Sequence, residues 1–374
     1  METSPAFRAF ACADCEESFA ADEIESVCPS CGGLLVAQYD HGAREETAVP
    51  ALPVDPVASM DEGATPATEC PTLANELGVD GLLIKDEGRN PTGSVTDRGL
   101  AVAVAAASAG GAQDVALPTT GSGGQSAAAY AGRAGLDSHS YVPTRSPFVN
   151  KAMINVHGGD MNVVEGRYPD ALEAYESGAE AEWFGVGPAS PYRREGLKSL
   201  GYELLAGRAE PPAAIVVPVG HGTVLASLHS AAEELRETGD LDAAPTLYAA
   251  QSDGCAPVAG ACGTADPVGT IEHPDTIVGP LEVPDPAAGE LAVAAVDETG
   301  GRGVAVEDSD ALQAAVDAAS TAGVELGATG GVALAAAREL SEEFDADETV
   351  AVVNPVAGSK EDDLLRSHLM SQGI

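Results

Sequence analysis

Short apolar runs alternate with longer stretches of helical periodicity along most of this chain. The apolar runs that favour β-strands fall at 81–87, 114–120, 138–143, 162–166, 213–219, 246–252 and 348–356. Stretches with apolar residues at helical spacing fall at 96–111, 125–135, 150–158, 168–180, 192–207, 224–239, 308–323 and 330–344. Because strands and helices alternate at this spacing, the pattern predicts an α/β fold built from βαβ units with parallel sheets.

Two of the predicted strands are apolar at successive positions rather than at alternate ones. They are AIVVPV at 214–219 and VAVV at 350–353. Such runs are typical of parallel strands that helices cover on both faces. Two stretches lack a clear period. We interpret the Pro-, Ala- and Glu-rich residues 41–66 as a linker and extended lead-in, and we leave the Pro- and Asp-rich residues 263–296 unassigned.

The charge balance limits the classes of molecule that this protein can bind. The 374 residues include 59 Asp and Glu but only 18 Lys and Arg, for a formal net charge of -41. Repulsion from the phosphate backbone therefore excludes nucleic acid as a partner. A hydrophobic fraction of 44% favours a folded protein over a disordered one. Since the acids are spread along the chain, we interpret the protein as halophilic, adapted to a high-salt cytoplasm that screens self-repulsion.

Neither a membrane span nor an export signal is expected. No apolar run approaches the roughly 18 residues that a spanning helix needs. The first residues, METSPAFRAF, lack the basic segment of a secretory signal. We therefore expect a cytoplasmic protein without a membrane partner.

Four of the seven cysteines fall close together near the N-terminus, as CADC and CPSC. Cys12, Cys15, Cys28 and Cys31 have the spacing C-x2-C-x12-C-x2-C. Two such knuckles bring four thiolates to one point, which matches a structural zinc site. Two disulfides are the alternative, and a reducing cytoplasm disfavours them. The pattern predicts a zinc-ribbon-like segment at 1–45.

Three turns rich in glycine and serine follow predicted strands and lead into helices or the chain end. They are PTTGSGGQSA at 118–127, PVGHGTVLAS at 218–227 and NPVAGSKEDD at 354–363. In open α/β sheets, ligands bind beyond the carboxyl ends of the strands, where helix N-termini suit anions. Together the turns predict a ligand crevice.

Several runs carry a resemblance to one family. KDEGRNPTGSVTDRG at 85–99 resembles the motif KxExxNPTGSFKDRG of threonine synthases, and PYRREGLKSLGYELL at 191–205 resembles NPYRxEGQKTxxFEI. TTGSGGQSAAAYAGRAG at 119–135 and AAIVVPVGHGTVLAS at 213–227 are similar to the family's STGN and phosphate loops. The chain is thus identified as threonine synthase-like, within the fold type II (tryptophan synthase β-like) family of pyridoxal-phosphate enzymes.

The resemblance implies a fold and a domain division. It implies two three-layer parallel-sheet domains with a crevice between them, behind the N-terminal ribbon. The larger domain would comprise residues 46–100 plus 190–374, and the smaller one residues 101–189. The family's reaction converts O-phosphohomoserine to threonine, a lyase chemistry of amino-acid metabolism that uses pyridoxal phosphate.

The resemblance also marks a departure at the position of the family's catalytic lysine. Where the family has SFKDRG, this sequence reads SVTDRG, so Thr96 stands where the family's lysine forms its imine with the cofactor. A threonine hydroxyl cannot form an imine. The chain has four lysines, Lys85, Lys151, Lys198 and Lys360, and none is an obvious replacement.

Further departures fall on the positions that the resemblance assigns to cofactor binding. Ser122 replaces an asparagine that meets the ring hydroxyl, and its reach is shorter. In the phosphate loop, Gly220, His221, Gly222 and Thr223 replace GNGG, and a β-branched residue such as Thr223 resists a positive φ. Asn354 or Pro355 occupies the place that faces the pyridine nitrogen.

Two functions remain open at this point. The first is a pseudoenzyme without lysine chemistry that binds an amino-acid-like ligand, or that regulates a catalytic paralogue as its partner. The second is a live threonine synthase, or a related pyridoxal-phosphate lyase acting on a phosphorylated amino acid. A homodimer is compatible with both. The sequence favours the first, because the departures fall at separate cofactor contacts.

Overall fold

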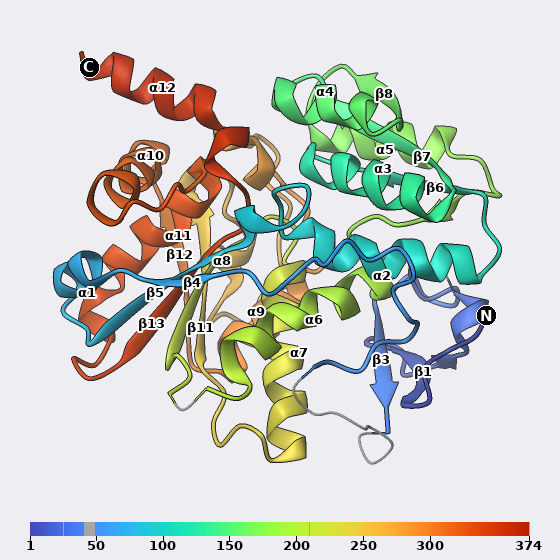
Figure 1. The fold of residues 1–374 in the computed structure, drawn as a ribbon, viewed down its shortest axis with the longest axis horizontal. Helices are drawn as coiled ribbons and strands as arrows, with labels where there is room; N and C mark the ends of the chain where they lie inside the picture. The colour runs from blue at the N-terminus through green and yellow to red at the C-terminus, as the bar shows by residue number, and fades with distance from the viewer. Residues whose placement is uncertain (25, 41–48, 209, 374) are drawn as a thin grey trace.

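The computed structural model describes residues 1–24, 26–40, 49–208 and 210–373. Three sheets organise them (Figure 1). A small antiparallel sheet lies near the N-terminus, a six-stranded sheet holds most of the C-terminal half, and a four-stranded parallel sheet lies at the other side of the molecule. The α/β class and the parallel sheets predicted from the sequence are confirmed.

The larger sheet has six strands in the order β12-β11-β10-β13-β5-β4, parallel except for β4. Its strands are β4 (Ala67–Glu69), β5 (Gly81–Asp86), β10 (Ala214–Pro218), β11 (Thr246–Ser252), β12 (Gly303–Val306) and β13 (Thr349–Asn354). Successive residues of β10 point to opposite faces, and each face is buried in its own core. Ala214 and Val216 belong to one core, while Ile215 and Val217 belong to the other. The uniformly apolar run at 214–219 is thus a strand that is covered on both faces.

Helices on both faces provide those two cores. One face packs against α1 (Pro71–Leu77), α10 (Asp308–Asp317), α11 (Ala328–Glu339) and the start of α12 (Asp362–Ser371). The other packs against α6 (Pro191–Leu205), α7 (Thr223–Thr238), α8 (Pro257–Ala261) and α9 (Gly289–Glu298). Among the described residues, no helix combines the length and the apolar character that crossing a membrane would require.

The smaller sheet has the order β8-β7-β6-β9, with all neighbours parallel. Its strands are β6 (Asp114–Pro118), β7 (Asp137–Pro143), β8 (Asp160–Val164) and β9 (Phe184–Gly185). Packed against it are α2 (Thr96–Ala109), α3 (Ser122–Ala134), α4 (Phe148–Val156) and α5 (Tyr168–Gly178). All four strands fall within the residues assigned above to a smaller domain, whereas its limits at 101 and 189 stay predictions.

The N-terminal sheet consists of β1 (Phe7–Cys12), β2 (Ser18–Phe19) and β3 (Leu35–Tyr39), paired β2-β1-β3. It packs against α2 and the start of α6 through one shared core, in which Phe10 meets Tyr192 edge-on with ring centroids 5.0 Å apart. Residues 41–48 of the expected linker lie outside the described residues, and residues 49–66 run on towards β4. The unassigned stretch 263–296 contains a 3-10 turn at Gly279–Leu281 and most of α9.

Candidate functional site

A crevice lies at the carboxyl ends of parallel strands from both larger sheets. It encloses about 870 Å³, including the space open to solvent. The turns after β6 and β10, the residues after β13 and the start of α2 all contribute to its lining. Helix N-termini at this edge present free backbone N–H groups, which is why ligands of open α/β sheets bind here. All three glycine- and serine-rich turns singled out from the sequence thus reach one cavity.

The turn between β6 and α3 forms one wall. Gly121 has a φ of 134°, a conformation that favours glycine, and its backbone N–H donates to Thr119 Oγ1 at 3.0 Å. Ser122 begins α3 and lines the crevice together with Gly123. Position 122 therefore faces the cavity as expected, with a side chain shorter than the family's asparagine.

The turn between β10 and α7 forms the facing wall. Gly220, His221, Gly222 and Thr223 all line the crevice. Gly222 has a φ of +80°, and a Cβ there would lie 2.6 Å from the Ala288 carbonyl oxygen, so a side chain does not fit. Thr223 begins α7 without a positive φ. The turn therefore accommodates the β-branched side chain at 223 without a positive φ.

The His221 ring is neutral at physiological pH. Burial, reinforced by the charge of Arg193, lowers its pKa to about 3. The ring packs edge-on against Tyr168, with centroids 4.7 Å apart, and its Nδ1 has no hydrogen-bond partner among the described residues. A ligand in the crevice can supply that partner, as donor or acceptor according to the tautomer.

Pro355, rather than Asn354, lines the crevice after β13. Asn354 is fully buried, and its Nδ2 donates to Asp86 Oδ1 at 2.8 Å. Its Oδ1 accepts from the Gly327 backbone N–H at 3.4 Å. Of the two residues that the sequence left open at this place, the one facing the cavity has neither a side-chain donor nor a backbone N–H.

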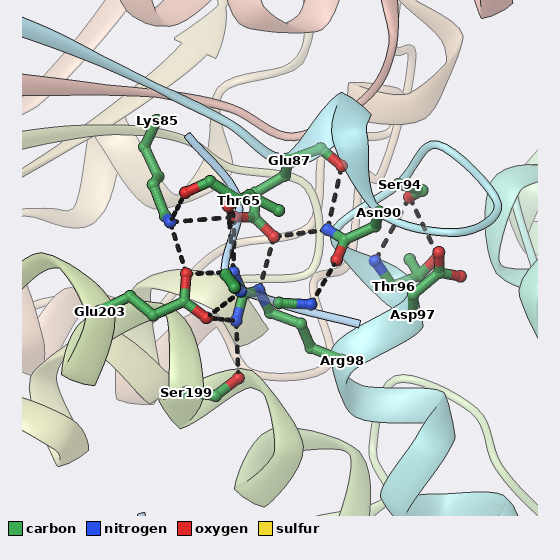
Figure 2. A network of polar contacts seen from close by, with 12 residues as sticks. Thr65, Lys85, Glu87, Asn90, Ser94, Thr96, Asp97, Arg98, Ser199 and Glu203 are labelled. Atoms are coloured by element: carbon green, nitrogen blue, oxygen red, sulfur yellow. Dashed lines mark hydrogen bonds and ion pairs between the residues drawn. The ribbon is translucent and has the colours of Figure 1, made fainter. Parts of the chain in front are cut away.

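Thr96 begins α2, and it also lines the crevice. Its hydroxyl donates to Ser94 Oγ at 3.0 Å (Figure 2). The next residue, Asp97, is fully buried and accepts hydrogen bonds from Thr92 and Ser126. The start of α2 is thus held by hydroxyl groups and the Thr92 backbone N–H, and the charge of Lys360 also favours the ionised form of Asp97.

A buried ion network lies close to Thr96 (Figure 2). Arg98 Nε donates to Glu87 at 2.6 Å, and its two terminal nitrogens meet both carboxylate oxygens of Glu203 at 2.7 and 2.8 Å. Lys85 Nζ donates to Glu203 at 2.5 Å and to the Thr65 carbonyl oxygen at 2.6 Å. Two cations face two carboxylates, so the network neutralises itself and fixes α2 against α6 and β5.

The other three lysines also bind partners. Lys198 pairs with Glu195 at 2.6 Å and also with Glu234, and Lys151 Nζ donates to the Thr144 carbonyl oxygen at 2.6 Å. Lys360 Nζ donates to Gln125 Oε1 at 2.7 Å, and burial lowers its pKa to about 8. No lysine belongs to the described residues that line the crevice.

Arg193 is the one Lys or Arg among the described residues that line the crevice. Its side chain is 8% exposed, its Nε has no hydrogen-bond partner, and it forms no ion pair with any described residue. Burial lowers its pKa to about 10, so it keeps its charge at neutral pH. Leaving a buried charge unpaired is costly, which makes Arg193 a strong anion-binding group.

The stretch that the sequence left unassigned closes one side of the crevice. Pro280 and Leu281 belong to the lining. The next residue, Glu282, is 4% exposed and pairs with Arg145 at 3.2 Å and with Arg167. Because both arginines belong to the part of the chain that carries the smaller sheet, these ion pairs join the two sides of the crevice.

The four N-terminal cysteines form a second candidate centre. All four sulfurs lie within 4.8 Å of one another, with Cys12 and Cys31 at 3.4 Å and Cys15 and Cys28 at 3.7 Å. A tetrahedral Zn–S₄ site with bonds near 2.3 Å requires sulfur separations of about 3.8 Å. The backbone N–H of Cys15, together with that of Asp14, outweighs the opposing effect of burial and lowers the pKa of Cys12 to about 7. The cluster therefore fits a closed, structural zinc site.

Residues 58–355 match the model of the pyridoxal-phosphate dependent enzyme family. The chain belongs to this family. The matched range includes the start of α2 and all the turns of the crevice up to Pro355. Pyridoxal phosphate is therefore the cofactor expected of its relatives.

This chain is similar to two threonine synthases over nearly its whole length. It is 30% identical to the threonine synthase of Methanosarcina acetivorans, covering 91% of this chain and 89% of the relative. It is 28% identical to that of Methanocaldococcus jannaschii, covering 94% and 93%. The threonine synthase-like identification made from the motifs is thus confirmed.

Solved structures support the fold. Diaminopropionate ammonia lyase from Escherichia coli superposes with a TM-score of 0.70 at 17% identity, over 84% of this chain and 90% of that one. Maize serine racemase superposes with a TM-score of 0.69 at 18% identity, over 83% and 94%. The fold type II architecture expected from the resemblance is confirmed.

The crevice fits only part of what the family's cofactor needs. The turn at 220–223 keeps the glycine cradle and the N-terminus of α7 that suit a phosphate. Among the described residues, no lysine amine lines the cavity to capture an aldehyde, and Pro355 offers the ring nitrogen no donor. The described residues therefore do not fit pyridoxal phosphate held through an imine.

Among the lining residues that sequence reasoning missed, Arg193 and Asn150 have polar side chains that are nearly buried. Arg193 stands in the PYRREG run, whose match identified the family, and a charged residue in such a run was the available signal. Asn150 lies on α4 in SPFVNKAM, where nothing in the local pattern distinguishes it. Only the tertiary fold brings Asn150 to the crevice.

Proposed function

We propose that this protein is a threonine synthase-like family member without lysine chemistry, which binds a small, anionic, amino-acid-like ligand non-covalently. The observation that supports this most is that all four lysines bind other groups while Thr96 and the unpaired Arg193 line the crevice. An anion can form ion pairs and hydrogen bonds there, but an aldehyde finds no amine. The protein would act as a ligand-binding or regulatory pseudoenzyme, as a homodimer or with a catalytic paralogue.

Covalent retention of pyridoxal phosphate tests this proposal. The purified protein is incubated with pyridoxal phosphate in molar KCl, treated with borohydride and analysed by intact mass. We expect the folded wild-type chain to gain no cofactor at a specific lysine. A denatured sample, in which the cofactor reacts with any exposed amine, gives the background. Thr96→Lys, which restores an amine at the start of α2, is the matched positive control and should gain one cofactor. A reducible adduct at a specific lysine of the wild type would refute the proposal.

A live threonine synthase is the second candidate, and the near full-length similarity to threonine synthases favours it. It is tested by threonine formation from O-phosphohomoserine in high salt. We expect background rates for the wild type. Thr96→Lys should also remain at background, because Ser122 is short and Pro355 offers no donor. Turnover well above background in the wild type would establish the enzyme instead.

We also propose that zinc fills the cysteine cluster. The sulfur separations and the closed set of four thiolates support this, because structural zinc takes four such ligands. Metal analysis of protein purified without chelators should give about one zinc per chain, which Cys12→Ser should remove. Retention of full zinc by that variant would place the metal elsewhere.

A further inference from the structure

Helix α4 exposes a row of apolar side chains on the side that faces water. Phe148 is 82% exposed and Val156 is 70% exposed. Ala152 lies midway between them and is partly exposed, and the spacing of four residues places all three in one row along the helix. The opposite side of α4, with Asn150 and Ile154, is buried. A surface helix normally presents polar side chains to water, so this row needs an explanation.

Further apolar groups lie beside this row. Val149 and Met153 follow its first and second members on the helix and are partly exposed. Val163 is 44% exposed and belongs to β8, the edge strand of the smaller sheet, against which α4 packs. Figure 1 shows α4 and β8 together at the outer end of the lobe that carries this sheet. We call the whole set the α4 patch: Phe148, Val149, Ala152, Met153, Val156 and Val163. Contiguous exposed apolar groups of this kind mark interaction surfaces.

The α4 patch lies in a part of the chain that is poor in acids. Residues 115–159 contain one acid, Asp137, and three residues that carry a full positive charge, Arg133, Arg145 and Lys151. Helices α5, α7, α9, α10 and α12 each carry two or more acids, whereas α4 carries none. Two copies of a chain with a net charge of -41 repel each other over most of their surfaces. They can approach through the α4 patch with the least repulsion.

The row on α4 is symmetric about its middle residue, which suits pairing with a second copy. Phe148 and Val156 are each four residues from Ala152. If a two-fold axis passes at Ala152 and the two helices run antiparallel, Phe148 packs against Val156 of the second copy, and the axis generates the same contact again. Ala152 has only a methyl side chain, so the helices can approach closely where they cross. The N-terminal pole of each helix then lies beside the C-terminal pole of the other, which is also favourable.

We propose that the α4 patch is the surface through which two copies of this chain associate, as an antiparallel pair of α4 helices on a two-fold axis at Ala152. A second copy fits better than a membrane, because anionic lipids would repel the rest of the chain. A helix of nine residues presents less area than the roughly 1,200–2,000 Å² that stable complexes bury, so the association is reversible. This inference rests on the homodimer named in the proposed function and adds its surface and its symmetry.

Sedimentation velocity of the full chain in about 2 M KCl, where repulsion is screened, tests the surface. We expect a monomer–dimer equilibrium with a dissociation constant on the order of 10 µM. Val156→Asp places an acid on each side of the pair and should weaken association at least about tenfold. Val57→Asp is the matched control, because Val57 is a valine of similar exposure, 73%, outside the patch. It should change the constant by less than about twofold. Both valines are exposed, so neither substitution disturbs the core.

A crosslink tests the position of the axis. In Ala152→Cys the two-fold axis brings the two new thiols within disulfide distance, so mild oxidation in molar KCl should link two chains through residue 152. Peptide mapping by mass spectrometry locates the link. Wild-type protein oxidised in parallel accounts for the seven native cysteines. Val57→Cys, at an exposed position outside the patch, should give no more linked chains than the wild type.

The possible outcomes separate this inference from the proposed ligand binding. A wild-type chain that stays monomeric at about 200 µM overturns the inference, also where it binds an added threonine synthase or phosphatidylglycerol vesicles instead. A dimer that Val156→Asp and Val57→Asp weaken equally overturns it too, as does a dimer in which no disulfide joins the two residues at 152. None of these measurements detects an amine that reacts with the cofactor, so the borohydride test decides the proposed function separately.

Discussion

Arg193 combines two properties that rarely coexist in one residue, a full charge and nearly complete burial without a counter-charge. Its neighbours in the chain bind the ribbon. The Tyr192 hydroxyl donates to the Ala21 carbonyl oxygen, and the Arg194 guanidinium donates to that of Leu35. Of the three, only Arg193 lines the crevice. Such an unpaired cation is maintained at a cost in stability, which is typical of a binding site.

Removing this charge should stabilise the ligand-free protein. Arg193→Met keeps the aliphatic length and deletes the unpaired guanidinium, so we expect the free energy of unfolding to rise by about 1–3 kcal/mol. Urea denaturation in molar KCl without carboxylate or phosphate measures the change. Arg133→Met, at an exposed position, should alter it by less than about 0.5 kcal/mol. A destabilised Arg193→Met protein would show that the guanidinium has a structural partner.

His221 should make stability depend on pH. Its pKa is about 3 in the folded protein against 6.5 for an unperturbed histidine, so below pH 6.5 the unfolded chain binds a proton that the folded chain does not. The free energy of unfolding therefore falls as the pH decreases through this window, by about 2 kcal/mol from this group between pH 7 and pH 5. His221→Asn should remove that part of the decrease in urea denaturation. An identical decrease in both proteins would contradict the assignment.

At the scale of elements, the ribbon and α6 behave as one unit. Phe10 packs on Tyr192, and hydrogen bonds from both sides of Arg193 end on the ribbon backbone. The cysteine cluster lies at the other end of the ribbon, where the knuckles around Cys12 and Cys31 are held mainly by backbone turns. The apolar part of the ribbon thus belongs to the main core, while its knuckles would depend on the proposed zinc.

Cys12→Ser should therefore loosen the knuckles and leave the main fold intact. Without four ligands the metal no longer contributes to the folding of residues 12–33, so amide exchange there should accelerate at least about tenfold. Exchange in β10 should stay at the wild-type rate. Mass-spectrometric hydrogen exchange measures both regions, with Cys262→Ser as a control outside the cluster. Equal acceleration in β10 would mean that the metal supports the whole fold.

At the scale of the whole molecule, the excess of acids is concentrated where it meets solvent. Three of the four lysines are buried, as are Arg98, Arg193 and Arg194. The exposed surface therefore carries even fewer cations than the count of 18 implies. With 59 acids against 18 basic residues, the acids at the surface are expected to repel one another.

Salt should consequently stabilise the protein strongly. Raising KCl from about 0.1 M to 1 M shortens the screening length from about 10 Å to 3 Å, so repulsion between neighbouring acids weakens. We expect the melting temperature, followed by circular dichroism, to rise by at least about 10 °C over this range. Sucrose at equal osmolality controls for solute exclusion and should have a smaller effect. A melting temperature that does not depend on KCl would refute the adaptation to high salt.

Much of the architecture could be predicted from local pattern. The strand at 214–219 and the helix that follows it are specified by continuous apolar residues and by the glycines between them, both of which are local signals. Short elements such as β4, β9 and α8 escaped prediction, because two to five residues carry too little periodicity. The stretch 263–296 escaped it because its prolines and acids satisfy tertiary contacts, such as the pairs of Glu282 with Arg145 and Arg167.

The chain by itself determined its family, its cysteine cluster and the turns that line the crevice, since each depends on residues close together in sequence. Only the tertiary structure decided which side chains face the cavity. It turned Asn354 inward to Asp86 and left Pro355 at the surface of the crevice. It also brought Asn150 and Arg193 from separate helices to one turn. The physical reason is that polar and charged side chains pair with residues that are distant in sequence. An unpaired group can therefore be recognised only when the positions of all its possible partners are known.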